Sequence, residues 1–132
     1  MTFWLWAAVT AGWFLLMTFL SHQDGPHTGE VSRTLAQELH PLLPAVDTAA
    51  LNRLLRRAAH PLLFGVLTVL LGITLHAGGA QPSRALAFGV LLFWCWADEA
   101  TKRGVSGRHF SWQDVGLNAL GTLCGGVVFW TL

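Results

Sequence analysis

The chain has few charged residues and few cysteines for its length. Of its 132 residues, 11% are charged and 53% are hydrophobic, whereas about 25% of the residues in an ordinary soluble domain are charged. The net charge of +1 lacks the basic excess of a nucleic-acid-binding protein, so we expect no nucleic-acid partner. Cys95 and Cys124 lie inside apolar segments and show neither a disulfide framework nor zinc-site spacing. A chain of this length and composition predicts one membrane domain.

The first 20 residues contain no charged side chain. A secretory signal begins with basic residues, continues with an apolar core of roughly 7–15 residues and ends at a small-residue cleavage site. This segment lacks the basic start, has a longer apolar run and is followed by no such cleavage pattern. We therefore expect a membrane helix that is retained.

Four apolar stretches predict an all-α fold, an integral membrane four-helix bundle that forms a single domain over residues 1–132. The first stretch rises about 27 Å as a helix, enough to span a bilayer core. The apolar part of the third stretch is too short to span alone, so Asp98 and Glu99 are expected inside that helix, near the interface. A GxxxG pair, Gly121 and Gly125, predicts close packing of the last helix. The expected helices are residues 3–20, 58–77, 82–101 and 112–132.

The first connection, residues 21–57, is long for so small a protein. It holds two polar–apolar stretches, 30–39 and 48–57, separated by prolines, and Asp47 can cap the second as a helix N-cap. Leucines recur at helical spacing in the second stretch. We expect this connection to be partly helical, either lying along the membrane surface or covering the bundle as an ordered loop. Residues 78–82 are expected to form a tight turn.

The ionisable residues gather at one end of the predicted bundle. The first and third connections, with the helix ends beside them, hold all seven acidic residues and seven of the eight basic ones, and only Arg84 lies elsewhere. In a four-span protein these two connections share one side of the bilayer. Charge at membrane depth is costly and by default suggests a functional site. The balanced numbers also predict extensive pairing between acids and bases.

A first candidate cluster lies at the start of the second predicted membrane helix. Arg53, Arg56 and His60 are spaced i, i+3, i+7 and share one helical face, with Arg57 beside them. Guanidinium groups bind phosphate or carboxylate through a bidentate fork. Arg53 and Arg57 also suit simple anchoring to lipid phosphates by snorkelling. We place Arg56 and His60 in the site.

A second cluster follows the third apolar stretch. Asp98 with Lys102 and Glu99 with Arg103 are acid-to-base pairs at i, i+4. These pairs can neutralise the carboxylates without a metal, and we predict no tightly held metal and no cofactor. Helix-end salt bridges of little energetic value are the alternative interpretation.

A third cluster joins the last loop to the last helix. Arg108, Asp114 and Asn118 occur there, with Asp114 and Asn118 at i, i+4. Asp114 can stabilise the start of the helix, or it can form a buried structural bridge with Arg108. Taken together, the clusters predict acid–base roles for Asp98, Glu99, Asp114 and His60. They also predict ligand binding by Arg56, Arg57, Arg108 and Asn118.

These residues also resemble motifs of the VanZ-like membrane protein family. Residues 55–60, Leu-Arg-Arg-Ala-Ala-His, resemble its RKxxH motif. Asp98-Glu99, Gly107-Arg108 and the segment 114–121 resemble its DExxQ…GR…DxxxNxxG block. Ser21, Gln23 and Ser32 resemble polar positions that follow the first helix in that family. The pattern departs at three positions, where the family usually has glutamine, an aromatic residue and proline: Lys102, Gly104 and Ser106.

The resemblance implies a multi-pass protein of the bacterial cytoplasmic membrane. It implies a cell-envelope role, with a link to resistance against the glycopeptide teicoplanin, and it adds Ser21 and Gln23 to the ligand-binding residues. The expected ligands are membrane lipids or a lipid-linked envelope precursor. No nucleophile motif is visible, so whether the site is catalytic stays open. So do protein partners.

Two further alternatives remain at this point. The charges could instead form a salt-bridge network that locks the helices in a non-catalytic scaffold or accessory protein. A proton-coupled transporter is disfavoured because the four short helices contain no broken-helix repeat. For orientation, the positive-inside rule places the charged face in the cytoplasm, whereas the resemblance implies an external face. We favour the external face.

Overall fold

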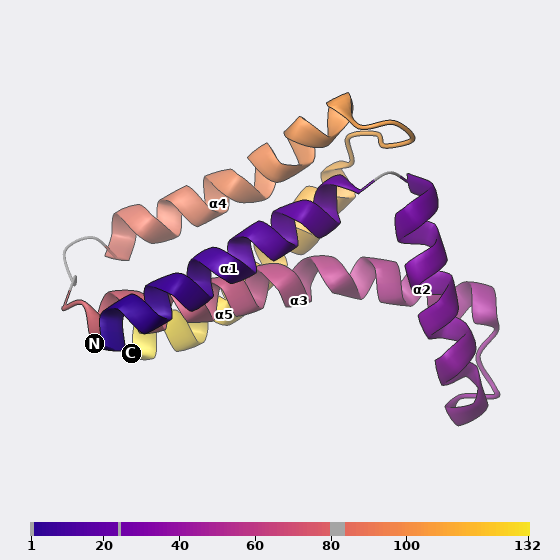
Figure 1. The fold of residues 1–132 in the computed structure, drawn as a ribbon, viewed down its shortest axis with the longest axis horizontal. Helices are drawn as coiled ribbons and strands as arrows, with labels where there is room; N and C mark the ends of the chain where they lie inside the picture. Colours follow the sequence, from indigo (N-terminus) through magenta and orange to yellow (C-terminus); the bar gives the residue numbers. More distant parts are fainter. Residues whose placement is uncertain (1, 24, 80–83) are drawn as a thin grey trace.

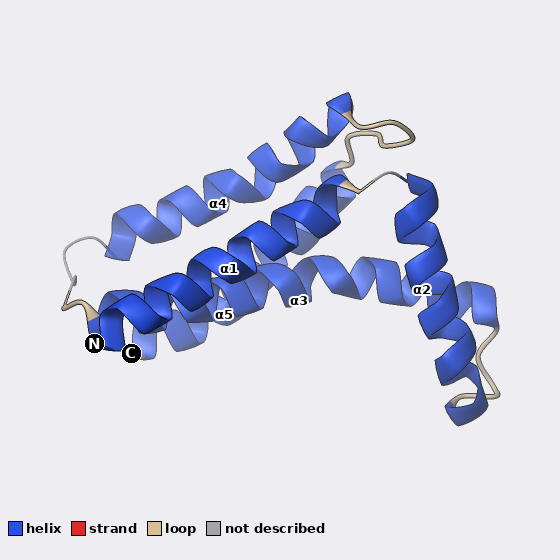
Figure 2. Cartoon of the chain, viewed as in Figure 1, coloured by secondary structure: helices blue, strands red, loops and turns tan. Residues whose placement is uncertain are grey.

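The computed structural model describes residues 2–23, 25–79 and 84–132, and this part of the chain is all-α (Figure 2). No strand occurs in those ranges. The helices are α1 (Thr2–His22), α2 (Gly25–Leu39), α3 (Thr48–Ala77), α4 (Arg84–Thr101) and α5 (Trp112–Thr131), with short 3-10 turns η1 (His40–Leu42) and η3 (Lys102–Gly104). The predicted fold class, all-α, is confirmed.

Four helices, α1, α3, α4 and α5, run side by side, and α2 crosses the amino-terminal part of α3 (Figure 1). Both chain termini lie at the same end of these helices (Figure 1). The connections that carry the charged residues meet at the other end. There Nε2 of His22 lies 2.8 Å from Oγ1 of Thr101, so the end of α1 contacts the end of α4.

Helix α3 is longer than the sequence patterns predicted. It begins at Thr48 rather than near residue 58, so the second stretch of the first connection continues directly into the long apolar helix. The expected cap is present, with the Ala50 amide donating to Oδ2 of Asp47 over 3.3 Å. Pro61 lies inside the helix and removes one backbone hydrogen bond. The helix nevertheless continues through Pro61, where its backbone lies against Gly121 of α5, and it packs against both α2 and α5.

Small residues bring α3 and α5 into backbone contact. A Cβ atom on Gly121 would collide with the Pro61 carbonyl, and one on Gly125 would lie 2.5 Å from the Gly65 carbonyl oxygen. Gly65 lies opposite Gly121 in the same way, with 3.2 Å for its own Cβ. The packing role predicted for the GxxxG pair is confirmed.

The remaining helix bounds lie close to the predicted ones. Asp98 and Glu99 belong to α4, as expected, and α5 spans nearly the predicted range. Residues 80–83 lie outside the described part, so the predicted turn over 78–82 and the predicted helix start at 82 are described only in part. Gly79 follows α3 at φ 67°, a conformation that glycine adopts without strain.

The interior is small and the outer surface is strongly apolar. Met17, Phe64, Leu67, Leu91 and Cys95 form the buried cluster between the helices. Two helices, α1 and α3, are long and apolar enough to cross a membrane by length and composition alone. Large apolar side chains also cover the outer faces of α1, α4 and α5, among them Leu15, Phe19, Leu86, Phe93, Leu123 and Val127.

Candidate functional site

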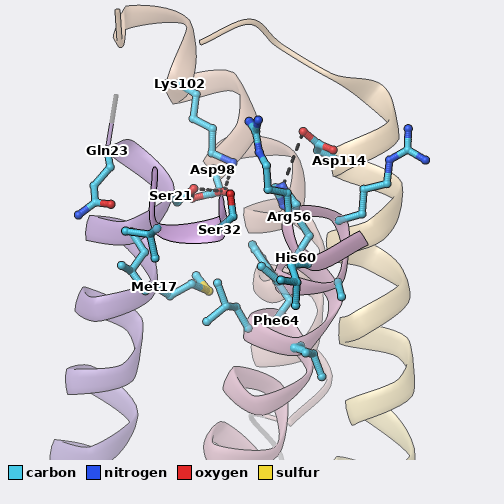
Figure 3. Close-up of a pocket in the computed structure, with 18 of the residues that line it drawn as sticks. Met17, Ser21, Gln23, Ser32, Arg56, His60, Phe64, Asp98, Lys102 and Asp114 are labelled. Atoms are coloured by element: carbon cyan, nitrogen blue, oxygen red, sulfur yellow. Dashed lines mark hydrogen bonds and ion pairs between the residues drawn. The ribbon is translucent and has the colours of Figure 1, made fainter. Parts of the chain in front are cut away.

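A cavity of about 610 Å³ opens at the charged end, where α1, α2 and α3 diverge. Its size is within the range of small-molecule sites. In Figure 3, Ser21, Asp98 and Lys102 lie on one side of this cavity, and Arg56, His60 and Asp114 lie on the other. Eight of the ten predicted site residues line it: Ser21, Gln23, Arg56, Arg57, His60, Asp98, Arg108 and Asp114.

One wall of the cavity is a row of arginines on α3. Arg53, Arg56 and Arg57 line it and are exposed to solvent. Within the described part of the chain, none of the three forms an ion pair or a hydrogen bond through its side chain. The start of α3 at Thr48 makes this possible, because it places all three on one continuous helix. Arg53, whose sequence position also suited lipid anchoring, therefore belongs to the cavity wall.

The opposite wall contains a buried ionic cluster. Nζ of Lys102 lies 2.6 Å from Oε2 of Glu99 and 3.1 Å from Oδ2 of Asp98. The Ser21 hydroxyl donates to the Asp98 carboxylate over 2.9 Å. The three charged side chains are at most 2% exposed. One ammonium group thus faces two carboxylates, and Asp98 is held from two sides.

This cluster confirms one predicted pair and corrects the other. Asp98 pairs with Lys102 as expected, whereas Glu99 also pairs with Lys102 and not with Arg103. The reason is that α4 ends at Thr101 and the chain tightens into η3. That turn directs Arg103 outward, where its guanidinium lies 4.6 Å from the centre of the Phe110 ring.

In the third predicted cluster, Asp114 lies in the first turn of α5, one of the two alternatives, and the other alternative, a bridge to Arg108, is not formed in the described residues. Oδ2 of Asp114 lies 3.7 Å from Nε2 of His60, a contact that is an ion pair only when the imidazole is protonated. Nε of Arg108 instead donates to the backbone carbonyl of Gln23 over 3.1 Å. Gly107, at φ 72°, bends the loop before Arg108. Arg108 therefore ties the last loop to the segment after α1 while still lining the cavity.

Two predicted site residues lie one layer behind the cavity surface. Glu99 contacts Lys102, as described above, and Asn118 contacts His60. Oδ1 of Asn118 is 2.9 Å from Nδ1 of His60, and its amide nitrogen donates to the Cys95 carbonyl over 3.3 Å. Asn118 is fully buried. Both residues support groups that line the cavity and do not line it themselves.

The apolar part of the cavity was missed at the sequence level. Leucines of α3 and side chains of α1 and α2 form it, and in Figure 3 Met17 and Phe64 lie below the charged groups. The helical spacing of the leucines near residue 51 was visible, but it did not reveal that α2 would cross α3 there. The apolar lining residues are Met17, Leu20, Val31, Leu35, Leu55, Ala58, Ala59, Leu62, Leu63 and Phe64.

In the described residues, no group of three or more His, Cys, Asp or Glu side chains is arranged to hold a metal ion. Comparison with known proteins adds no assignment: no family model, no curated protein and no solved structure matches the chain. The cavity itself is therefore the basis for assigning a function.

Proposed function

We propose that this chain is a multi-pass integral membrane protein whose charged end binds the anionic head group of a lipid or of a lipid-linked envelope component. The observation that carries the proposal is the row of three arginines without side-chain partners in the described residues, set beside an apolar wall in one cavity.

The membrane part of the proposal rests on the outer surface. Soluble monomers rarely expose contiguous apolar patches larger than a few hundred Å², and here such side chains extend along α1, α4 and α5. Helices α1 and α3 satisfy the length and hydropathy expected of a span. In the proposed arrangement α4 and α5 also span, and the buried ionic cluster closes α4 at the interface.

The ligand part rests on charge. The described lining residues include five cationic side chains, Arg53, Arg56, Arg57, Lys102 and Arg108, against two carboxylates, Asp98 and Asp114. Lys102 is committed to carboxylates that are themselves buried. Arg108 also has contacts of its own. The three α3 arginines are therefore the cations of the cavity whose side chains have no partner in the described residues. Guanidiniums bind phosphate through a bidentate fork, as they bind carboxylate, and phosphate is the anionic group of a lipid head group.

The lipid part rests on the apolar wall. A free phosphate or nucleotide would leave that wall in contact with water, whereas the first carbons of an acyl or polyprenyl chain would cover it. Burying apolar surface contributes about 25 cal/mol per Å². The cavity thus suits an amphiphile, with its head group at the arginines and its chain leaving past Leu20 and Leu62.

Location and biological role follow from the VanZ-like motif pattern described above. We place the protein in the bacterial cytoplasmic membrane with the charged end outside, where envelope precursors are processed, and both termini in the cytoplasm. A role in envelope modification or teicoplanin resistance belongs to this proposal. Reporter fusions at the carboxyl terminus test the orientation. Activity there of a reporter that works only in the periplasm would mean that the charged end faces the cytoplasm.

A non-catalytic scaffold is the second candidate, and the buried cluster of Asp98, Glu99 and Lys102 favours it. That cluster joins neighbouring positions of one helix end and, through Ser21, joins α4 to α1. The scaffold hypothesis explains these residues but gives no role to the α3 arginines. The two hypotheses therefore predict different effects of replacing these arginines: weaker lipid binding in the first, and no such effect in the scaffold.

Lipid titration of the purified full chain in a neutral detergent tests the binding function. We expect dioleoyl phosphatidylpropanol, an anionic lipid without head-group hydroxyls, to bind more tightly than dioleoyl phosphatidylcholine. The double variant Arg53→Gln/Arg56→Gln should bind the anionic lipid at least about tenfold more weakly, because hydrogen bonds to charged groups contribute roughly 1.5–3 kcal/mol each.

The matched control is Arg33→Gln/Arg103→Gln, which removes the same charge from residues that do not line this cavity. We expect it to bind both lipids like the unmodified chain. Equal loss in both double variants would mean that only the overall charge matters. That result, or no preference for the anionic lipid, would favour the scaffold.

A further inference from the structure

His60 is held with a defined proton position. Its Nδ1 lies 2.9 Å from Asn118, whose other side-chain atom donates to the Cys95 carbonyl. That second bond identifies the nitrogen of the buried amide, so the atom facing His60 is the oxygen, an acceptor. Nδ1 of His60 must therefore carry a hydrogen and donate it. In the neutral imidazole, Nε2 then bears the lone pair.

Nε2 of His60 lies beside a second acceptor at the cavity surface. The Asp114 carboxylate is 3.7 Å away, too far for a hydrogen bond. Within the described residues, no side-chain or backbone donor reaches that carboxylate. The side chains of His60 and Asp114 are 19% and 29% exposed, so a ligand in the cavity can reach both. With the imidazole neutral, two hydrogen-bond acceptors thus lie next to the arginine row.

The two acceptors and the arginines would bind different parts of one ligand. Phosphate oxygens suit the arginines but find no donor at Nε2 and are repelled by Asp114. Hydroxyl groups suit the two acceptors, and the spacing between Nε2 and the carboxylate allows neighbouring hydroxyls to donate one bond each. A head group without donors would leave both acceptors unpaired when it displaces water, which lowers affinity.

We infer that the site selects an anionic lipid whose phosphate is esterified to a polyol, with hydroxyls close to the phosphate. Glycerol and sugar phosphodiesters have this chemistry. The inference rests on the proposed function, because it names the class of lipid that the arginine cavity takes. An ammonium head group could also donate hydrogen bonds, but the excess of arginines around the cavity disfavours a second cation there.

Two lipids of equal charge and chain composition isolate the hydroxyls. Dioleoyl phosphatidylglycerol and dioleoyl phosphatidylpropanol share a phosphodiester and a three-carbon head group, and only the first carries hydroxyls. In titrations of the full chain in neutral detergent, we expect the glycerol lipid to bind roughly three- to tenfold more tightly, the effect of one or two net hydrogen bonds. Dioleoyl phosphatidylethanolamine should bind more weakly than either.

The possible outcomes distinguish a failure of the polyol selection from a failure of anionic-lipid binding. Equal binding of the glycerol and propanol lipids, with both tighter than phosphatidylcholine, would overturn the polyol selection and leave anionic-lipid binding intact. Anionic lipids no tighter than phosphatidylcholine would overturn the proposed function itself. Tightest binding of phosphatidylethanolamine would overturn the polyol assignment in favour of an ammonium donor.

Variants then locate the selection. His60→Leu and Asp114→Leu should each reduce the preference for glycerol over propanol toward equality while the propanol lipid still binds. His76→Leu is the matched control, because this exposed histidine lies at the far end of the same helix, and it should keep the preference. A preference unchanged in both His60→Leu and Asp114→Leu would overturn the assignment to these acceptors. The comparison of lipids on the unmodified chain holds even where a variant fails to fold.

Discussion

The two halves of α3 differ in almost every physical respect. From Pro61 onward, the helix packs against α5 so closely that the backbones touch at Gly65 and Gly121. Before Pro61, it turns charged side chains toward a cavity, and α2 crosses it there (Figure 1). The first half has no partner for its arginines in the described residues, whereas the second buries Phe64, Leu67 and Thr68.

This difference shows how a small helical protein can separate stability from binding. In a lipid environment, close van der Waals packing of small residues holds helices together, and the α3–α5 contact provides it. The cavity end carries what such packing cannot tolerate: uncompensated cations and a buried ionic cluster. A site of this kind costs stability locally and requires a well-packed region elsewhere.

The largest effect is expected at the ionic cluster, because its three charged side chains are buried. Lys102→Met removes the ammonium group and leaves Asp98 and Glu99 buried without a cation. Breaking a buried ion pair in this way costs roughly 3–5 kcal/mol. We expect a large fall in the melting temperature measured in detergent.

The triple variant Lys102→Met/Asp98→Leu/Glu99→Met is the control for that experiment. Replacing a whole buried ionic cluster by apolar residues of similar volume can be nearly neutral for stability, so most of the loss should be recovered. If Lys102→Met melted like the unmodified chain, the cluster would not be buried in the working protein. The cavity end would then lack the buried charge that distinguishes it from the packed end of α3.

The next effect concerns the packed end. Gly121→Ala places a Cβ atom against the Pro61 backbone, and backbone cannot move aside as a flexible side chain can. Overpacking of this kind costs about 1–3 kcal/mol or more. Gly116→Ala is the matched control on the same helix, since nothing lies within 4 Å of its added methyl group. That change should be neutral or stabilising by up to about 1 kcal/mol. Equal melting temperatures for the two variants would show that the α3–α5 contact is looser.

Much of this architecture could be predicted from periodicity and composition. The apolar stretches predicted α1, α4 and α5 within a few residues, and the glycine pair predicted the α5 contact. The start of α3 could not be predicted, because residues 48–57 carry the charged pattern of a connection and the apolar run begins only near residue 58. The joined helix packs against α2 and α5, and no local sequence pattern encodes such tertiary contacts.

The sequence predicted which residues belong to the candidate site better than it predicted which of them pair with one another. Helical spacing placed Arg56 and His60 on one face, and the predicted four-span topology placed Asp98 at the same end. The structure brings all three to one cavity. The partners of Glu99 and Asp114 depend on where α4 ends and how the Gly107 turn directs the loop, and a change of one residue in a helix end redirects a side chain by about 100°. The apolar wall depends on the crossing of α2 over α3, for which the sequence carries no local signal.

The smallest effect tests whether the two halves of α3 respond separately. Asp47 caps only the first turn, where its carboxylate accepts from the Ala50 amide. Asp47→Ala should cost about 1 kcal/mol, and the loss should appear as roughly fivefold faster amide exchange. We expect this change over residues 48–57, with residues 61–77 unaffected because α5 holds them. Asp47→Asn is the matched control, since asparagine caps equally well, and it should exchange like the unmodified chain. Faster exchange along the whole of α3 in the alanine variant would mean that the helix opens as one unit, and the arginine wall would then share the stability of the packed end.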